Sequence, residues 1–233
     1  MNVDFQRPFR APDGAREVLL VRHGSVGHQP AGAQEPPIGR QNDPPLNDAG
    51  RAQAAAVAAR LDDEPISAVF VSTLRRTVET AAPLLDARAT APEVLEDLRE
   101  VELGDWEHGE LSRRALRGDA EFRRVMREQR WELIPNAEPA ADFGRRVERG
   151  LQSAAASAGP GEIAVAFTHS AVIAEACRQV TGSEPFAFLS VANGSLTRIV
   201  LMPGGHWVLV AFNETQHLPR EWQPGGSGAT AVR

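Results

Sequence analysis

The chain has 233 residues, 42% of them hydrophobic and 24% charged, and its formal net charge is −6 at pH 7. These values are ordinary for a globular protein, and the acidic balance does not favour nucleic acid as a partner. No apolar run approaches the ~20 residues that cross a bilayer, and the first residues lack the apolar segment of a secretory signal. The single cysteine, Cys177, excludes an internal disulfide framework. We therefore expect a cytoplasmic protein that binds neither nucleic acid nor a membrane.

The first half of the chain alternates aliphatic runs with segments of helix-forming residues. Asn47 and Asp48 are both suitable N-caps for an alanine-rich helix, and Gly14 and Gly24 bound the first aliphatic run. In chain order we expect a flexible arm at 1–16, a strand at 17–22, a loop at 25–46, a helix at 46–61, a strand at 68–72 and a helix at about 74–86.

The second half continues the alternation and ends in two adjacent strands. In chain order we expect an extended piece at 94–106, a charged helical segment near 111–130, a loop and a helix within 135–159, a strand at 162–169, a helix at 170–181 ended by Gly182, strands at 195–202 and 206–213, and a disordered tail at 219–233. Strands that alternate with helices predict an α/β domain over 17–218 with a mostly parallel central sheet.

Polar side chains follow three of the predicted strands where each strand ends. The first strand ends in Arg22 and His23, the second is followed by Ser72 and Arg76, and the third leads into His169. In open α/β sheets ligands bind outside the carboxyl ends of the strands, so these side chains are expected to converge. Guanidinium groups suit phosphate oxygens, and an imidazole among them can attack phosphorus. The sequence therefore predicts an anion site with a nucleophilic histidine.

These residues belong to segments that resemble a known family. The segment LLVRHGS resembles the RHG signature of the histidine phosphatase superfamily, which includes the cofactor-dependent phosphoglycerate mutases. Four further segments, NDPPLNDAGRAQA, STLRRTVETA, LREVELGDWE and FTHSAVI, are similar to the family's motifs and follow in its order over roughly residues 18 to 212. The resemblance implies a three-layer α/β/α fold like that of phosphoglycerate mutase, with a helical cap, about residues 104–150, over the pocket.

The resemblance also implies a role for each matching residue. His23 would be the nucleophile that becomes phosphohistidine, Arg22 and Arg76 would clamp the phosphate oxygens, and His169 would stabilise the transferring group. Glu100 would be the general acid that protonates the leaving oxygen and then activates water. No metal and no cofactor is implied.

Other residues leave alternatives open. Glu102 lies two residues after Glu100 and would point the same way in an extended segment, so it is a second candidate for the proton donor. Ser25 is included among the expected substrate-binding residues, and the role of His28 in the same loop stays open. Glu138 is a weaker candidate. One or two cap arginines would reach a second anionic group, out of Arg113, Arg114, Arg117, Arg123, Arg124, Arg127 and Arg130.

The details of the motifs favour hydrolysis over a mutase reaction, in which the phosphoryl group is returned to the substrate. Mutases of the family read RHGES followed by an Asn, whereas this chain reads RHGSVGH, and THSAVI replaces the commoner H-G-G or H-G-S form. We therefore expect a metal-independent phosphomonoester hydrolase acting on a small phosphorylated metabolite that the sequence does not identify. The alternatives are a cofactor-dependent phosphoglycerate mutase and a non-catalytic module that binds a phosphorylated ligand. A homodimer through an edge strand is a further possibility.

Overall fold

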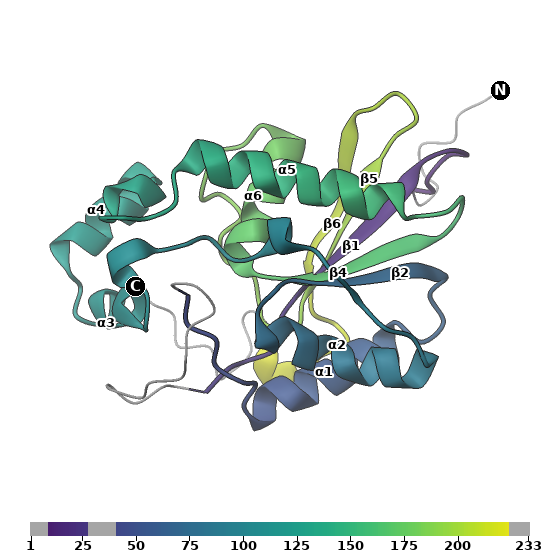
Figure 1. The fold of residues 1–233 in the computed structure, drawn as a ribbon, viewed down its shortest axis with the longest axis horizontal. Helices are drawn as coiled ribbons and strands as arrows, with labels where there is room; N and C mark the ends of the chain where they lie inside the picture. Colours follow the sequence, from purple (N-terminus) through teal and green to yellow (C-terminus); the bar gives the residue numbers. More distant parts are fainter. Residues whose placement is uncertain (1–8, 28–40, 224–233) are drawn as a thin grey trace.

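The computed structural model describes residues 9–27 and 41–223, which build one six-stranded sheet (Figure 1). The strands are β1 (Arg16–Arg22), β2 (Ile66–Val71), β3 (Glu93–Val94), β4 (Ile163–Thr168), β5 (Leu196–Leu201) and β6 (Trp207–Glu214). Their order in the sheet is β3-β2-β4-β1-β5-β6. The first four strands of that order pair in parallel, and only β5 runs antiparallel to its neighbours. The prediction of a mostly parallel central sheet is confirmed.

Helices cover both faces of this sheet. The helices α1 (Asp48–Arg60) and α2 (Arg75–Arg88) lie below it in Figure 1, and α5 (Ala140–Ala156) and α6 (Ser170–Thr181) lie above it. Asn47, rather than Asp48, caps α1, because its side chain accepts the N–H of Gly50 at 2.8 Å. Gly182 ends α6 in the left-handed conformation, as the sequence predicts. The three-layer α/β/α arrangement is therefore present.

The two apolar cores follow from the alternation of side chains along each strand. On β1, Val18 and Leu20 pack with α5 and α6, whereas Leu19 and Val21 pack with α1 and α2. Cys177 is buried in the first of these cores, and burial raises the pKa of its thiol to about 12. Both faces of the sheet are thus covered, which leaves the strand ends for a binding site.

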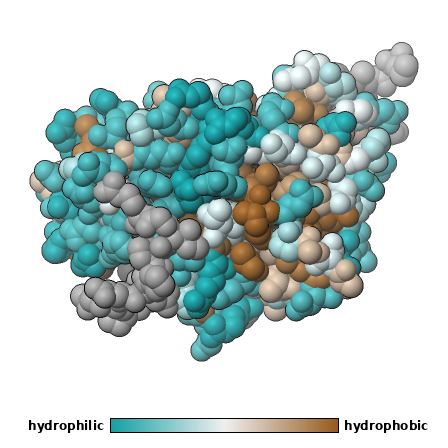
Figure 2. Space-filling model, viewed as in Figure 1, coloured by the Kyte–Doolittle hydropathy of each residue, from teal (hydrophilic) through white to brown (hydrophobic). Residues whose placement is uncertain are grey.

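The cap differs from its prediction in detail. The charged segment near 111–130 is two helices, α3 (Glu110–Leu116) and α4 (Ala120–Glu128), which lie to the left in Figure 1. They separate at Gly118, where φ is +61°, and Asp119 then caps α4 by accepting the N–H groups of Glu121 and Phe122 at 3.0 Å. Figure 2 shows that hydrophilic side chains dominate this part of the surface.

The segments next to the cap and at the chain ends also depart from simple extended or disordered structure. Within 94–106 only Val94 belongs to a strand. The rest contains the short 3₁₀ turns η1 (Glu96–Leu98) and η2 (Gly104–Trp106), and further turns are η3 (Trp131–Leu133) and η4 (Arg220–Trp222). The η4 turn lies inside the predicted tail, whose residues 224–233 fall outside the described part, as do residues 1–8 of the predicted arm and 28–40 of the predicted loop. No helix of the described residues is long and apolar enough to span a bilayer.

The loop that follows β1 lies directly on the start of α1. A Cβ atom added at Gly50 would lie 2.0 Å from the carbonyl oxygen of Ser25, and one added at Gly24 would lie 2.5 Å from the carbonyl oxygen of Gly50. The N–H of Asn47 donates to the same Ser25 oxygen at 3.0 Å. Two glycines therefore permit the backbone approach that fixes the loop carrying His23.

We expect Gly50→Ala to lower the free energy of unfolding by about 1–3 kcal/mol, the usual cost of forcing extra volume into a packed contact. Alanine has the higher helix propensity, so a net loss would come from the contact with Ser25 rather than from the helix itself. Urea denaturation measures the change. Gly27→Ala is the matched control, since its added Cβ meets nothing within 4 Å. A Gly50→Ala protein as stable as the parent would contradict the close approach.

Candidate active site

Adjacent strands bring the predicted histidines together at the carboxyl edge of the sheet. Arg22 on β1 pairs in register with Thr168 on β4, so His23 and His169 follow at the same level. The N–H of His23 donates to the carbonyl of Thr168 at 3.0 Å. The ring centroids of the two histidines are 5.2 Å apart.

His23 is oriented for nucleophilic attack. The residue is 6% exposed, and its Nδ1 lies 2.8 Å from the carbonyl oxygen of Gly24. A carbonyl can only accept, so Nδ1 carries the proton and Nε2 keeps its lone pair in the neutral ring. Asn193 donates its side-chain N–H to the carbonyl of His23 at 2.9 Å, which fixes the backbone there. The imidazole lines a cavity, so its lone pair is available to a ligand.

Burial and the neighbouring arginines keep both imidazoles neutral. Burial is the main cause that lowers the pKa of His23 well below 6.5, and Arg76 and Arg22 lower it further. Burial, followed by the positive charge of Arg76, also places the pKa of His169 well below 6.5. Burial lowers the pKa of Arg22 to about 10, so its guanidinium stays charged at neutral pH. The site therefore combines two cations with two neutral imidazoles.

These shifts predict that acid destabilises the fold. Below pH 6.5 the unfolded chain binds protons at His23 and His169 that the folded protein does not bind, so the stabilisation present above that pH is lost as pH falls. Each histidine contributes a slope of about 1.4 kcal/mol per pH unit. We expect the NMR signals of both rings, assigned by substitution, to stay constant from pH 8 to 5.5, while free histidine titrates near 6.5. A midpoint near 6.5 for either ring would contradict its neutral burial.

Two buried polar atoms among these residues have no hydrogen-bond partner. Arg22 donates one terminal N–H to the carbonyl of Val191, but its Nε is buried and unpaired. The Nε2 of His169 lies 2.8 Å from the hydroxyl of Ser72, whereas its Nδ1 is buried and unpaired. Leaving such groups unsatisfied costs about 1–3 kcal/mol each. A bound anion that accepts from the Arg22 Nε–H would remove one of these costs.

Arg76 is the third member of the group. It follows β2 on α2, donates to the carbonyl of Asn42 at 3.0 Å and lies 3.9 Å from a carboxylate oxygen of Asp43. Its guanidinium also interacts with Glu100, since that carboxylate is the largest influence that offsets the lowering of the Arg76 pKa by burial. The structure thus places His23, Arg76 and Glu100 on one cavity, whereas Arg22 and His169 lie near His23 and do not themselves line that cavity.

Glu100 and Glu102 do not share the site. Glu100 lines the cavity with His23; one carboxylate oxygen accepts the N–H of Val101 at 3.0 Å, and the other lies 3.4 Å from the N–H of Ala171. Glu102 does not line this cavity, and its side chain pairs with Arg99 at 3.0 Å. The backbone between them is not a strand, so the two-residue alternation does not apply.

Three other candidates lie away from the cavity or outside the described residues. The hydroxyl of Ser25 accepts from the side chain of Asn47 at 3.1 Å, and Ser25 does not line the cavity. Glu138 makes a two-oxygen ion pair with Arg146 at 2.7 and 2.8 Å. His28 falls within 28–40, outside the described residues. The expected substrate contact of Ser25 is therefore not supported.

Six of the seven candidate cap arginines, all except Arg123, pair with acidic groups of the cap, and none of the seven reaches the cavity. Arg114 contacts Glu110, Asp119 and Glu121 at 3.0–3.1 Å and lies over the ring of Trp106, 4.8 Å from its centroid. The other arginines with acidic partners in the cap are Arg113, Arg117, Arg124, Arg127 and Arg130. None of the seven lines the cavity, so the expectation that one or two would meet a second anion fails for the described residues.

The cavity has a volume of about 220 Å³ and includes residues that the sequence analysis does not assign. The structure adds Gln41, Asn42, Glu107, His108 and Ser112 to its lining. Glu107 lies in the matched segment LREVELGDWE, and that match could have identified it as a site residue. Asn42 begins the matched segment NDPPLNDAGRAQA, whereas Gln41 lies just before it in a Gly- and Pro-rich stretch with no pattern of its own.

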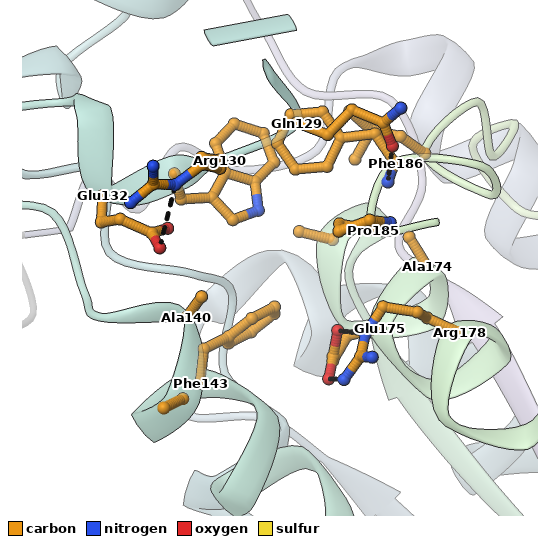
Figure 3. Close-up of a pocket in the computed structure, with 14 residues that line it drawn as sticks. Gln129, Arg130, Glu132, Ala140, Phe143, Ala174, Glu175, Arg178, Pro185 and Phe186 are labelled. Carbon is orange, nitrogen blue, oxygen red and sulfur yellow. Dashed lines mark hydrogen bonds and ion pairs between the residues drawn. The ribbon is translucent and has the colours of Figure 1, made fainter. Parts of the chain in front are cut away.

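A second cavity of about 310 Å³ is lined in part by residues of α6 and is shown in Figure 3. Phe143, Phe186 and Ala174 line it, and its charged side chains are paired as Arg130 with Glu132 and Arg178 with Glu175. Of the residues predicted for the site, only the cap arginine Arg130 lines it, and that side chain is paired with Glu132. The candidate active site is therefore the smaller cavity, because only that one contains His23.

Comparison with known proteins agrees with this geometry. The family model of the histidine phosphatase superfamily, branch 1, matches residues 18–215. Phosphoglycerate mutase-like protein 4 of Arabidopsis thaliana is 32% identical over 207 residues, covering 87% of this chain and 86% of that protein. A metal-independent phosphoserine phosphatase of the same plant is 25% identical over 233 residues, covering 93% and 91%.

Solved structures with low sequence identity share the fold. A putative alpha-ribazole-5′-P phosphatase from Escherichia coli has a TM-score of 0.69 at 21% identity, covering 86% of this chain and 97% of that one. A phosphoglycerate mutase from Bacillus anthracis has a TM-score of 0.69 at 18% identity, covering 88% and 96%. The family-model match and the 32% identical relative together establish that this chain belongs to the histidine phosphatase superfamily, branch 1.

Proposed function

We propose that this protein is a metal-independent phosphomonoester hydrolase that acts on a small phosphorylated metabolite through a phosphohistidine intermediate. One observation carries the proposal: the neutral imidazole of His23, with its Nδ1 held by a carbonyl, lines a cavity together with Arg76 and Glu100. Superfamily relatives named as phosphatases and mutases support the reaction class.

The first step transfers the phosphoryl group to the enzyme. The Nε2 lone pair of His23 attacks phosphorus, an N–P bond forms, and the P–O bond to the alcohol breaks. Glu100 in its acid form gives a proton to the leaving oxygen, so a neutral alcohol departs. Arg22, Arg76 and His169 stabilise the charge that spreads over the three phosphoryl oxygens in the transition state.

The second step regenerates the enzyme. The Glu100 carboxylate takes a proton from a water molecule that attacks phosphorus, the N–P bond breaks, and its electron pair returns to His23 Nε2. The products are inorganic phosphate and an enzyme with Glu100 protonated again. The same carboxyl group thus acts as acid and then as base, so the protons balance over one turnover.

The alternative with the strongest support is a phosphoglycerate mutase, because one relative is named phosphoglycerate mutase-like. A mutase must hold a substrate with a second anionic group and return the phosphoryl group to it. Most of the cap arginines that would bind such a group pair with acidic side chains, and none of the seven lines the cavity. Hydrolysis by water needs no such contact, which favours the phosphatase.

Turnover of p-nitrophenyl phosphate in the presence of a chelator tests the proposal. We expect release of p-nitrophenol and capture of a phosphoenzyme that is stable in base and labile in acid. Interconversion of phosphoglycerate isomers that depends on 2,3-bisphosphoglycerate would establish the mutase instead. Binding of a phosphate ester without either turnover would indicate the binding module.

We expect Glu100→Gln to lower kcat/KM for an alkyl phosphate by roughly 100-fold, because the leaving alkoxide then lacks its proton donor. The loss with p-nitrophenyl phosphate should be much smaller, since nitrophenolate leaves without protonation. Glu102→Gln is the matched control. It should change kcat/KM for either substrate by less than about twofold, which is the usual size of the effect of a surface substitution. The reverse outcome, a leaving-group-dependent loss in Glu102→Gln alone, would move the proton donor to Glu102.

A further inference from the structure

The lining of the cavity also offers hydrogen-bond acceptors to a ligand, among them a carboxyl group that interacts with Arg76. Glu107 carries this carboxyl group, and one carboxylate oxygen accepts the N–H of Leu103 at 2.8 Å. The backbone N–H of Asn42 also bonds to this carboxyl, which is therefore fixed from two segments of the chain. Backbone donors hold the carboxyl in place, so substrates do not have to organise it.

Gln41 adds an unsatisfied acceptor at the same wall. Its side-chain nitrogen donates to the carbonyls of Glu100 at 2.8 Å and Val101 at 3.2 Å, and this pairing settles which end of the amide is nitrogen. The amide oxygen is then left buried without a hydrogen-bond partner. Gln41 itself is 3% exposed and lines the cavity. A hydrogen-bond donor on a ligand would give this oxygen the partner that it lacks.

The charges around the cavity disfavour a second anion on the ligand. Among the described lining residues, Arg76 is the only arginine, and it belongs to the phosphoryl site together with His23. The two lining carboxylates, Glu100 and Glu107, interact with each other, since Glu100 contributes to raising the pKa of Glu107, after burial as the main cause. A carboxylate or second phosphate would be placed beside Glu107, where no cap arginine lines the cavity and the basic cap residue His108 already interacts with Glu107. Like charges in contact are strongly unfavourable.

We infer that this subsite, formed by Gln41, Asn42, Glu107, His108 and Ser112, binds the alcohol half of phosphomonoesters whose alcohol presents hydrogen-bond donors and carries no second anionic group. Hydroxyl and ammonium groups share that donor chemistry. Glu107 is the residue that determines this specificity. The inference rests on the proposed hydrolase function and names the substrate class for it.

Two pairs of esters that differ in one group test the subsite. Glycerol 3-phosphate carries a CH₂OH group where 3-phosphoglycerate carries a carboxylate, and phosphoethanolamine carries a CH₂NH₃⁺ group where phosphoglycolate carries a carboxylate. We expect kcat/KM of the parent protein to be at least about tenfold higher for the donor member of each pair. Glu107→Gln keeps an acceptor for the Leu103 N–H but removes the charge, and it should reduce each ratio by at least about tenfold.

Glu128→Gln is the matched control, because it makes the same charge change on the cap at a residue that pairs with Arg124 and does not line the cavity. It should leave both ratios unchanged. Equal kcat/KM values within each pair for the parent protein, or ratios that persist in Glu107→Gln, would overturn the inference.

A binding measurement separates failure of the subsite from failure of the hydrolase. Calorimetric titration of the His23→Ala protein with the same four esters reports affinity without turnover, and the donor members should again bind at least about tenfold more tightly. If the parent hydrolyses none of the esters and no p-nitrophenyl phosphate, the proposed function fails, while the affinity ratio still supports or overturns the subsite.

Discussion

Replacement of His23 by alanine is expected to lower kcat/KM for p-nitrophenyl phosphate by at least about a thousandfold, because removal of a covalent nucleophile leaves only binding and electrostatic stabilisation. No other described histidine combines a position on this cavity with the two nearby arginines; His108 lines the cavity but belongs to the cap. The captured phosphoenzyme should disappear with the activity. Phosphate release in the presence of a chelator and labelling quenched in base, where the N–P bond survives, are the two measurements.

The His23→Ala comparison needs evidence that the variant is folded. Its circular dichroism and its urea midpoint report that directly, and a cooperative transition would show that the loss is chemical. His169→Ala serves as the companion variant and should retain a slow phosphoenzyme, since the nucleophile is still present. Activity within tenfold of the parent in a folded His23→Ala protein would mean that another residue accepts the phosphoryl group.

Arg146→Ala should be the most destabilising of the single substitutions considered, with a loss of about 3–5 kcal/mol, the usual cost of removing one partner of a buried ion pair. Arg146 lies on α5 and is 7% exposed. It donates to both carboxylate oxygens of Glu138 and to the carbonyls of Asp97, Arg99 and Glu100. Since it holds the backbone of the proton donor, kcat should fall as well in whatever fraction remains folded.

Chemical denaturation compares Arg146→Ala with Arg145→Ala as a matched control. Arg145 is the next residue on α5, and its partner Asp142 and its own side chain are both exposed, so its loss should cost no more than about 1 kcal/mol. Glu138→Gln completes a double-mutant cycle with Arg146→Ala, and the two effects should be strongly non-additive. Equal stabilities of the Arg145 and Arg146 variants would show that the buried pair does not hold this region.

The strands and most helices were predictable because their signals are local. Residues 17–22 and 162–169 are short aliphatic runs with turn residues on one side, and both form central strands that pair with each other. A histidine stands at the end of each run. This was enough to predict that His23 and His169 converge, since parallel strands end at one edge of a sheet. The charged segment near 111–130 is helical as predicted, but Gly118 and the cap at Asp119 divide it into two helices.

The distribution of roles among neighbouring charged residues depended on contacts between distant parts of the chain. Glu100 and Glu102 have the same chemistry and nearly the same sequence position, but Arg146 and Gln41 hold the carbonyl of Glu100 and turn the segment so that only Glu100 lines the cavity. Likewise, Glu138 matched a weak site signal and is instead the partner of Arg146.

The sequence by itself determined the α/β fold, the edge of the sheet that carries the site and the group of His23, His169, Arg22 and Arg76. These depend on periodicity and on the order of motifs, which are properties of the chain alone. Only the tertiary structure decided that most cap arginines pair with acidic groups of their own cap and that Gln41 and Glu107 line the cavity. The physical reason is that an arginine or a glutamate has the same sequence signal whether its partner is a ligand, a backbone carbonyl or another side chain, and folding selects that partner.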